Sequence, residues 1–301
     1  MMRVDAHQHY WALVRGDYDW ISSARPIINR DFLPVDLKPL LAQNSVAQTV
    51  LVQSTPTMAE TKFLLTLAEN EASIAGVVGW VDLASPSACD LLEQLARYKK
   101  FLGIRMMAQP ETDPDWLAQP AFTSALEKLA TLEKSLDILA LEAHLPALEI
   151  LSARHANLRI VLNHAAKPAI SDGAFTSWSA ALRRLAQNPN TFCKLSGLTA
   201  LARPEFLIGD LAPYFDEVIA AYGPKRTIWG SDWPVLNESS SYDTWMKITN
   251  DLLAPLPQDE RDQILSGTAI SAYRLPKPTS FQITSDHAHL ITSHIRRHKI
   301  V

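Results

Sequence analysis

Two histidines separated by one residue, His7 and His9, follow a short apolar run near the start of the chain. In a β-strand alternate side chains point to the same side, so these two imidazoles would project next to each other. Neutral imidazole nitrogens bind divalent ions, and a pair held in this way could supply two ligands. Because a lone His-x-His pair also arises by chance at a protein surface, the pair predicts a site only if distant residues complete it.

Other polar side chains that could complete the site interrupt or end apolar segments further along the chain. His164 and Asp232 each close such a segment and have a proline shortly after them. The remaining candidates are Gln53, Arg105, His144, Lys194 and Ser196. A carboxylate beside two histidines could hold a metal ion or take a proton from water, so Asp232 is the predicted water-activating group. If the activated water attacks a carbonyl group, His164 is the predicted stabiliser of the oxyanion that forms.

Four polar residues are predicted to contact a substrate. Arg105 has a planar fork that suits a carboxylate or a hydroxyl-rich ligand. Gln53 and Lys167 would offer hydrogen bonds at the ends of their strands. Lys194 points inward if the residues two positions before and after it share its face, and otherwise its ammonium reaches the surface.

Aromatic residues are expected around the mouth of the site: Trp11, Tyr18, Trp20 and Trp233. Their flat faces suit the C–H surface of a sugar ring, which predicts substrate contact. The same side chains could instead pack the long loop expected over residues 11–34, and the sequence leaves both alternatives open.

The segments that must position these residues alternate between two patterns. Apolar runs predict a first strand from Val4 into the histidine pair, followed by strands over 49–53, 74–81, 101–107, 136–141, 158–163, 191–195 and 227–230. Helical periodicity predicts helices over 36–43, 58–71, 85–98, 120–134, 146–155, 178–187, 204–222, 243–253 and 258–266, with Asp36 and Ser85 as caps. Strands that alternate with helices predict a parallel sheet, and this number of strands closes into a (β/α)8 TIM barrel. An open doubly wound sheet is the alternative, but no Gly-x-Gly-x-x-Gly follows the first strand.

The barrel has a consequence for the site, because catalytic groups of such barrels lie at the carboxyl ends of the strands. The histidine pair stands at the end of the first predicted strand, and His164 and Asp232 stand at the ends of the sixth and eighth. We therefore expect all four side chains to meet at one face of the molecule.

Composition sets the remaining limits. With 301 residues, of which 47% are hydrophobic, the chain can form one barrel domain over residues 1–276. The net charge of −4 offers no basic surface for nucleic acid, and no apolar run approaches the roughly 20 residues of a membrane span. Two cysteines and the lack of a signal peptide at the start predict a cytoplasmic protein, whose oligomeric state stays open. Residues 277–301 are expected to be an extension, either a short helix or poorly ordered.

Several short blocks together resemble the amidohydrolase superfamily, and in particular its sugar-lactonase branch of the L-fuconolactonase and L-rhamnonolactonase type. The blocks are Asp5-Ala6-His7-Gln8-His9-Tyr10-Trp11, Tyr18-Asp19-Trp20, Gly103-Ile104-Arg105, Asn163-His164-Ala165-Ala166-Lys167-Pro168, Cys193-Lys194-Leu195-Ser196-Gly197-Leu198 and Trp229-Gly230-Ser231-Asp232-Trp233-Pro234. The resemblance runs from about residue 3 to 275. Two positions depart from it, since Asn163 replaces an expected aspartate and Thr268 an expected asparagine.

The resemblance implies a (β/α)8 barrel in which His7, His9, His164 and Asp232 surround a divalent metal, zinc or manganese, and the attacking water. Members of the branch differ in whether they need the ion, and no organic cofactor is expected. The implied reaction is the opening of a sugar-acid lactone (an aldonolactone) to the free acid. A decarboxylase or hydratase acting on an unsaturated or aromatic acid is one alternative, and a sugar-acid-binding barrel without catalysis is another.

Overall fold

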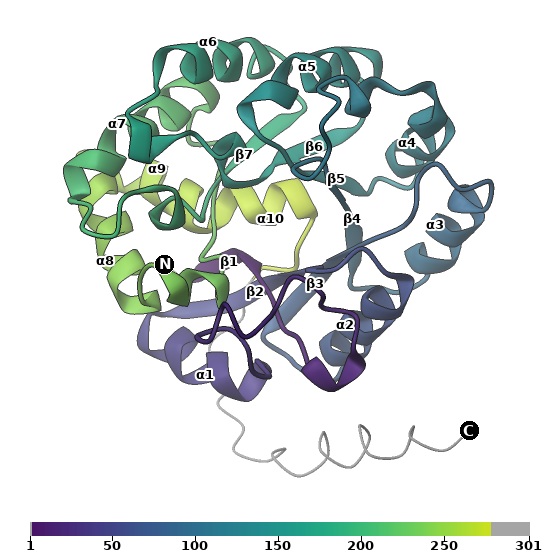
Figure 1. The fold of residues 1–301 in the computed structure, drawn as a ribbon, viewed down its shortest axis with the longest axis horizontal. Helices are drawn as coiled ribbons and strands as arrows, with labels where there is room; N and C mark the ends of the chain where they lie inside the picture. Colours follow the sequence, from purple (N-terminus) through teal and green to yellow (C-terminus); the bar gives the residue numbers. More distant parts are fainter. Residues whose placement is uncertain (1, 278–301) are drawn as a thin grey trace.

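Eight parallel strands form the centre of the molecule, in the computed structural model that describes residues 2–277 (Figure 1). They are β1 (Arg3–Gln8), β2 (Val46–Val52), β3 (Ile74–Gly79), β4 (Phe101–Met107), β5 (Ser135–Leu139), β6 (Arg159–Leu162), β7 (Thr191–Leu195) and β8 (Thr227–Trp229). Each strand pairs with the next one in the sequence. After β8 the chain returns to β1, where the amide of Asp232 donates to the carbonyl of His7 over 2.7 Å. The predicted (β/α)8 barrel is confirmed, and the open sheet is excluded.

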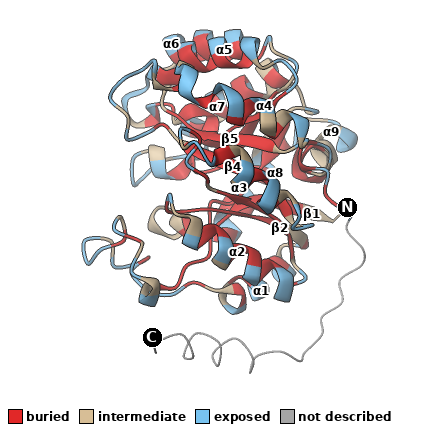
Figure 2. Ribbon diagram, turned by 90° about the vertical axis from the view of Figure 1, so that its right-hand side faces the viewer, coloured by how far each residue is buried: buried red, intermediate tan, exposed pale blue. Residues whose placement is uncertain are grey.

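Helices surround the strands as an outer layer, apart from the last helix, which crosses the middle of the molecule in Figure 1. They are α1 (Pro34–Gln43), α2 (Met58–Asn70), α3 (Ala88–Ala96), α4 (Thr123–Thr131), α5 (Leu145–Arg154), α6 (Thr176–Leu185), α7 (Ile208–Tyr222), α8 (Tyr242–Leu253), α9 (Gln258–Asp262) and α10 (Thr268–Tyr273). Figure 2 shows buried residues on the strands and on the helix sides that face them, with exposed residues on the outside. Such amphipathic helices bury one stripe against the sheet and so stabilise both layers.

Several of the predicted helix starts were wrong, among them those of α1 and α3. Helix α1 begins at Pro34, before Asp36, and Asp36 caps the helix from its third position by accepting the amide of Leu33 over 2.9 Å. Proline suits the first turn because it has no amide hydrogen to leave unpaired. Helix α3 begins at Ala88, so Ser85 precedes the helix and does not cap it.

Helix α7 begins at Ile208 and not at residue 204, because Asp210 accepts the amide of Leu207 and fixes the start of the helix there. The predicted closing helix over 258–266 is helical throughout, but it is not a single α-helix. The chain forms α9, then a π-helical turn over Gln263–Gly267, and then α10. The π-helical turn admits one extra residue per turn and redirects the chain.

Helix α10 belongs to the inner core of the barrel. Its side chains Ala269, Ala272 and Tyr273 pack in one cluster with inward-facing strand residues such as Val4 and Val50. A second, larger cluster fills the space between strands and outer helices. Because packed side chains fill the barrel, the inside is a core and not a channel.

A β-bulge in β1 determines which side chains of this strand face the interior of the barrel. The pairing of β1 with β2 shifts register between Asp5 and Gln8. Asp5 points outward and accepts hydrogen bonds from Ser231 and from Tyr242 of α8. In a regular strand Asp5 and His7 would share a face, so the bulge allows His7 to turn inward.

Within residues 2–277, no helix is long and apolar enough to cross a membrane. The extension predicted for 277–301 lies, apart from Lys277, outside the described residues.

Candidate active site

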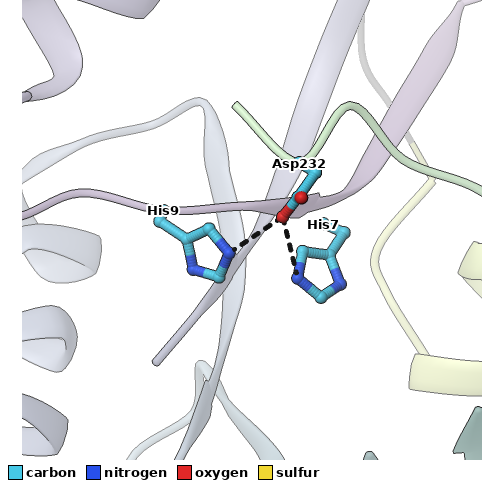
Figure 3. Close-up of side chains that lie close together, drawn as sticks. All are labelled: His7, His9 and Asp232. Atoms are coloured by element: carbon cyan, nitrogen blue, oxygen red, sulfur yellow. Dashed lines mark hydrogen bonds and ion pairs between the residues drawn. The ribbon is translucent and has the colours of Figure 1, made fainter. Parts of the chain in front are cut away.

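Three histidines converge on one carboxylate oxygen at the carboxyl ends of the strands. Oδ1 of Asp232 lies 3.2 Å from Nε2 of His9, 3.6 Å from Nε2 of His7 and 3.7 Å from Nε2 of His164. Figure 3 shows His7 of β1 and His9, which follows β1, turned toward Asp232, which follows β8. All four side chains are at least nine-tenths buried. The residues predicted from separate strand ends therefore do meet at one place.

The backbone at two of these residues adopts a conformation that L-amino acids rarely take. Asp232 has a φ of 62°, and His164 begins a run of left-handed residues that continues through Lys167. The run is fixed by Trp178 of α6, whose indole donates to the carbonyl of Ala165 over 2.7 Å. Each left-handed residue costs roughly 1–2 kcal/mol, and such strain is concentrated at functional sites.

The hydrogen bonds of His9 determine what the site can hold. Its Nδ1 lies 2.8 Å from the carbonyl oxygen of Val52, which can only accept, so Nδ1 carries the hydrogen of the neutral ring. Nε2 then offers a lone pair to Asp232, although the carboxylate is itself an acceptor. Two acceptors at this distance are stable only with a proton or a cation between them.

A divalent metal ion fits this arrangement. One ligand atom from each of His7, His9 and Asp232 lies within 4.8 Å of the others. Nε2 of His7 is also buried and has no hydrogen-bond partner within the described part of the chain. Two imidazoles and a carboxylate are a donor set that zinc commonly accepts.

The electrostatic environment keeps the carboxylate charged and the rings neutral. Burial raises the pKa of Asp232, but His164 and His9 lower it to about 2. Burial lowers the pKa of His164 to about 3, despite the opposing effect of Asp232. Burial, followed by the ammonium of Lys194, lowers the pKa of His7 well below its usual value. At neutral pH the site therefore combines one negative charge with neutral imidazoles, the protonation state that metal ligands require.

Arg105 and Gln53 hold each other beside the histidines. A guanidinium nitrogen of Arg105 donates to the carbonyl of Gln53, and the amide of Gln53 donates to the carbonyl of Arg105 over 3.4 Å. Nε of Arg105 and Oε1 of Gln53 are buried and have no partner within residues 2–277. Each of these two atoms lacks a partner that a bound ligand could supply.

Lys167 stands at the end of the left-handed run, and its ammonium donates to Oε1 of Gln109 over 2.7 Å. Gln109 follows β4 and was not predicted from the sequence. Arg25 lies in the loop after β1, stacks on Trp20 with its guanidinium carbon 4.9 Å from the ring centre, and pairs with Glu238. The loop after β4 is thus joined to the loop after β6, and the loop after β1 to the loop after β8.

Most of the predicted sugar-stacking aromatics lie inside the protein. Trp11 and Trp233 are buried and both pack edge-on against Phe32, with ring centres 5.5 Å and 5.2 Å away. Tyr18 is buried as well, whereas Trp20 is partly exposed. This placement agrees with the alternative in which these residues pack the long first loop.

Lys194 points inward, as predicted, but lies beneath the histidines. It is fully buried, and its ammonium donates to Asp137 over 2.7 Å and lies 3.3 Å from Nδ1 of His7. Asp137 was missed, although a lone charged residue in an apolar strand was a usable signal.

His144 bonds to the backbone of Leu141 and Glu111, and so connects two loops.

The barrel and its histidine–aspartate cluster define the class of protein. Residues 4–275 match the family model described as Amidohydrolase, and the chain belongs to this family. An L-fucono-1,5-lactonase from Burkholderia ambifaria is 40% identical, over 93% of this chain and 98% of that protein. An L-fucono-1,5-lactonase from Burkholderia multivorans is 36% identical, over 94% and 99% of the two chains. The crystal structure of a Burkholderia multivorans amidohydrolase with bound zinc has a TM-score of 0.86 and 36% identity, and covers 92% of this chain and 100% of that one.

Proposed function

We propose that this enzyme opens a sugar-acid lactone, an aldonolactone of the L-fucono-1,5-lactone type, to the free acid. The convergence of His7, His9 and His164 on Oδ1 of Asp232 carries the proposal. The similarity to two proteins named L-fucono-1,5-lactonase, each along nearly its whole length, supports this substrate class.

Asp232 takes the proton of the attacking water in the proposed reaction. Its pKa of about 2 leaves it ionised, and its buried position limits competition from other water. The water oxygen bonds to the lactone carbonyl carbon, and the carbonyl oxygen becomes an oxyanion. The bond from this carbon to the ring oxygen then breaks, and the ring oxygen takes the proton from Asp232, so that a carboxylic acid and a hydroxyl result. The carboxylic acid then loses the remaining proton of the water to the solvent and becomes a carboxylate.

His164 stabilises the oxyanion in this scheme. Its Nδ1 lies 2.8 Å from Oγ of Ser196, and a serine hydroxyl that donates there leaves the hydrogen of the neutral ring on Nε2, toward Asp232 and the site. Such donors, fixed before the reaction, commonly contribute a rate factor of about 10²–10³. The unpartnered groups of Arg105 and Gln53, together with Lys167, bind the sugar hydroxyls and the new carboxylate.

A divalent ion would be held by His7, His9 and Asp232, and we propose zinc, as in the Burkholderia multivorans structure. When bound, it supplies a Lewis acid that lowers the pKa of water from 15.7 towards about 7.

The proposal is tested by incubating the purified protein with a panel of aldono-1,4- and 1,5-lactones. Acid release is followed with a pH indicator and compared with the spontaneous rate of each lactone. We expect a 1,5-lactone of a 6-deoxy sugar acid to be opened fastest. Release of carbon dioxide from hydroxybenzoates, without acid release from any lactone, would support the decarboxylase alternative instead. Binding of sugar acids with no turnover would support the binding protein.

A further inference from the structure

We propose that Lys194 is a positioning residue, which fixes the imidazole of His7 from inside the barrel by donating a hydrogen bond to its Nδ1. The kinetic part of its test rests on the proposed lactone hydrolysis, whereas the structural part does not.

Lys194 is too deep to contact a substrate. Its side chain has no exposed surface, and neither has that of Asp137, which binds the ammonium. His7 lies between the ammonium and the mouth of the site: its Nδ1 is 3.3 Å from Nζ of Lys194, and its Nε2 is 3.6 Å from Oδ1 of Asp232. The ammonium can therefore act on the reaction only through the histidine ring.

Asp137 anchors the lysine by accepting from several directions. Its Oδ2 accepts from Lys194 over 2.7 Å, from the hydroxyl of Tyr273 over 2.7 Å and from the side-chain amide of Asn163 over 3.1 Å. Its Oδ1 accepts from the hydroxyl of Ser135 over 3.3 Å. Since these donors are fixed on β5, on β7, on α10 and at the residue directly after β6, the carboxylate cannot rotate freely. It holds the ammonium in one place.

The bond from Lys194 makes His7 and His9 chemically different. An ammonium has hydrogens and no lone pair, so Nδ1 of His7 must accept. The single hydrogen of the neutral ring then lies on Nε2, pointing toward Asp232 and the site. In His9 the hydrogen lies on Nδ1, toward Val52, and Nε2 offers a lone pair.

The pair therefore presents one donor and one acceptor to the same carboxylate. His9 and Asp232 offer lone pairs to a cation directly, whereas His7 must first give up its Nε2 hydrogen. Without an ion, the Nε2–H of His7, which has no hydrogen-bond partner within residues 2–277, is left to donate to an oxygen of the substrate. Groups that orient a functional histidine in this way typically change activity or metal affinity about 10–100-fold when removed.

The proposal is first tested on the unaltered protein, freed of metal with a chelator and labelled with ¹⁵N-histidine. Long-range proton–nitrogen NMR spectra distinguish Nδ1–H from Nε2–H rings, and the His7 signals are assigned as those missing from a His7→Asn variant. We expect His7 in the Nε2–H form and His9 in the Nδ1–H form. A His7 ring with its hydrogen on Nδ1 would overturn the proposal.

The second test removes both charges together, because loss of one partner leaves an unpaired buried charge. In Lys194→Met/Asp137→Asn we expect the His7 ring to lose its single tautomer and kcat to fall about tenfold or more, with KM within about twofold. The matched control is Arg183→Met/Glu217→Gln, which removes an ion pair between α6 and α7 outside the barrel. We expect this control to leave kcat and the His7 signals unchanged.

Two results of the second test would contradict the positioning role. Unchanged His7 signals and kcat in the double variant would show that the pair serves stability alone. A higher KM with an unchanged kcat would show that Lys194 binds substrate. If the unaltered protein opens no lactone, the proposed function fails, and the NMR spectra still decide the role of Lys194.

Discussion

Gly197 lies directly against the imidazole of His164. A β-carbon at position 197 would lie 2.8 Å from Nδ1 of His164 and 3.1 Å from Oδ2 of Asp232. The residue also has a φ of 66°, a conformation that glycine adopts readily and other residues do not. The site therefore depends on a position that has no side chain, just after β7.

Gly197→Ala is predicted to damage both stability and activity. The left-handed backbone and the contact with His164 together are expected to lower the free energy of unfolding by about 2–4 kcal/mol. Displacement of His164 and Asp232 should lower kcat about 10²-fold, because a shift of about 1 Å has such effects at a reacting centre. Urea unfolding and lactone turnover measure the two effects.

Gly173→Ala is the matched control for this substitution. Gly173 has a nearly equal φ of 67°, but nothing lies within 4 Å of its added β-carbon. We expect this variant to lose only the backbone contribution, about 1–2 kcal/mol, and to keep its activity. Equal losses of turnover in both variants would show that crowding at position 197 is not what matters.

Asp232→Asn is predicted to remove most of the turnover and to keep the fold. The amide has the same shape and can donate to Nε2 of His9, which offers a lone pair at 3.2 Å from the present oxygen. Without a carboxylate the water loses its base, and we expect kcat to fall about 10²–10⁴-fold. Asp251→Asn, on the exposed side of α8, controls for the change of charge. A kcat within threefold of the unaltered enzyme would exclude Asp232 as the base.

Zinc is predicted to stabilise the protein through the histidine–aspartate cluster. An ion that binds only the folded state at a hundred times its dissociation constant adds about 2.7 kcal/mol to the free energy of unfolding. We expect the melting temperature to fall on treatment with a chelator and to recover when zinc is added. His9→Asn should abolish this response, because it removes the ligand with a free lone pair. A zinc response that persists in His9→Asn would place the ion elsewhere.

The strand ends that build the site could be predicted from the sequence, because parallel strands in a barrel all end at the same face. His7, His9, His164 and Asp232 were found in this way, and the structure brings them within hydrogen-bonding or ion-pair distance of one oxygen. The barrel itself followed from the alternation of apolar runs and helical periodicity, which are local properties.

Contacts that depend on register or on loop conformation could not be predicted in the same way. Asp137 meets Lys194 across the barrel interior, and their encounter depends on how far neighbouring strands are staggered. Gln109 reaches Lys167 only because a loop takes one particular course. Trp11 and Trp233 resemble sugar-stacking residues by type, and only tertiary packing shows that they are buried.

Glu60 of α2 connects the loop after β2 to its helix and has an unusual response to pH. Its buried carboxylate accepts the amides of Ser54 and Thr55 and the hydroxyl of Ser54, the last over 2.6 Å. Burial nevertheless raises the pKa of Glu60 from 4.5 to about 7. In the folded protein this carboxyl therefore remains protonated at pH values where the unfolded chain has already lost the proton.

Stability is predicted to fall as pH rises through this range because of Glu60. Because the pKa of Glu60 is raised in the folded state, the carboxyl makes its full contribution to the free energy of unfolding below about pH 4.5. This contribution is lost as the pH passes about 7. The shift corresponds to about 3 kcal/mol. Urea unfolding from pH 5 to pH 8 should show the advantage of the unaltered protein over Glu60→Gln shrinking by about this amount, because the amide does not titrate. Glu69→Gln, on the exposed side of the same helix, controls for the change of charge at α2. A difference between the unaltered protein and Glu60→Gln that stays constant across this range would show that the carboxyl titrates alike in the folded and unfolded chains.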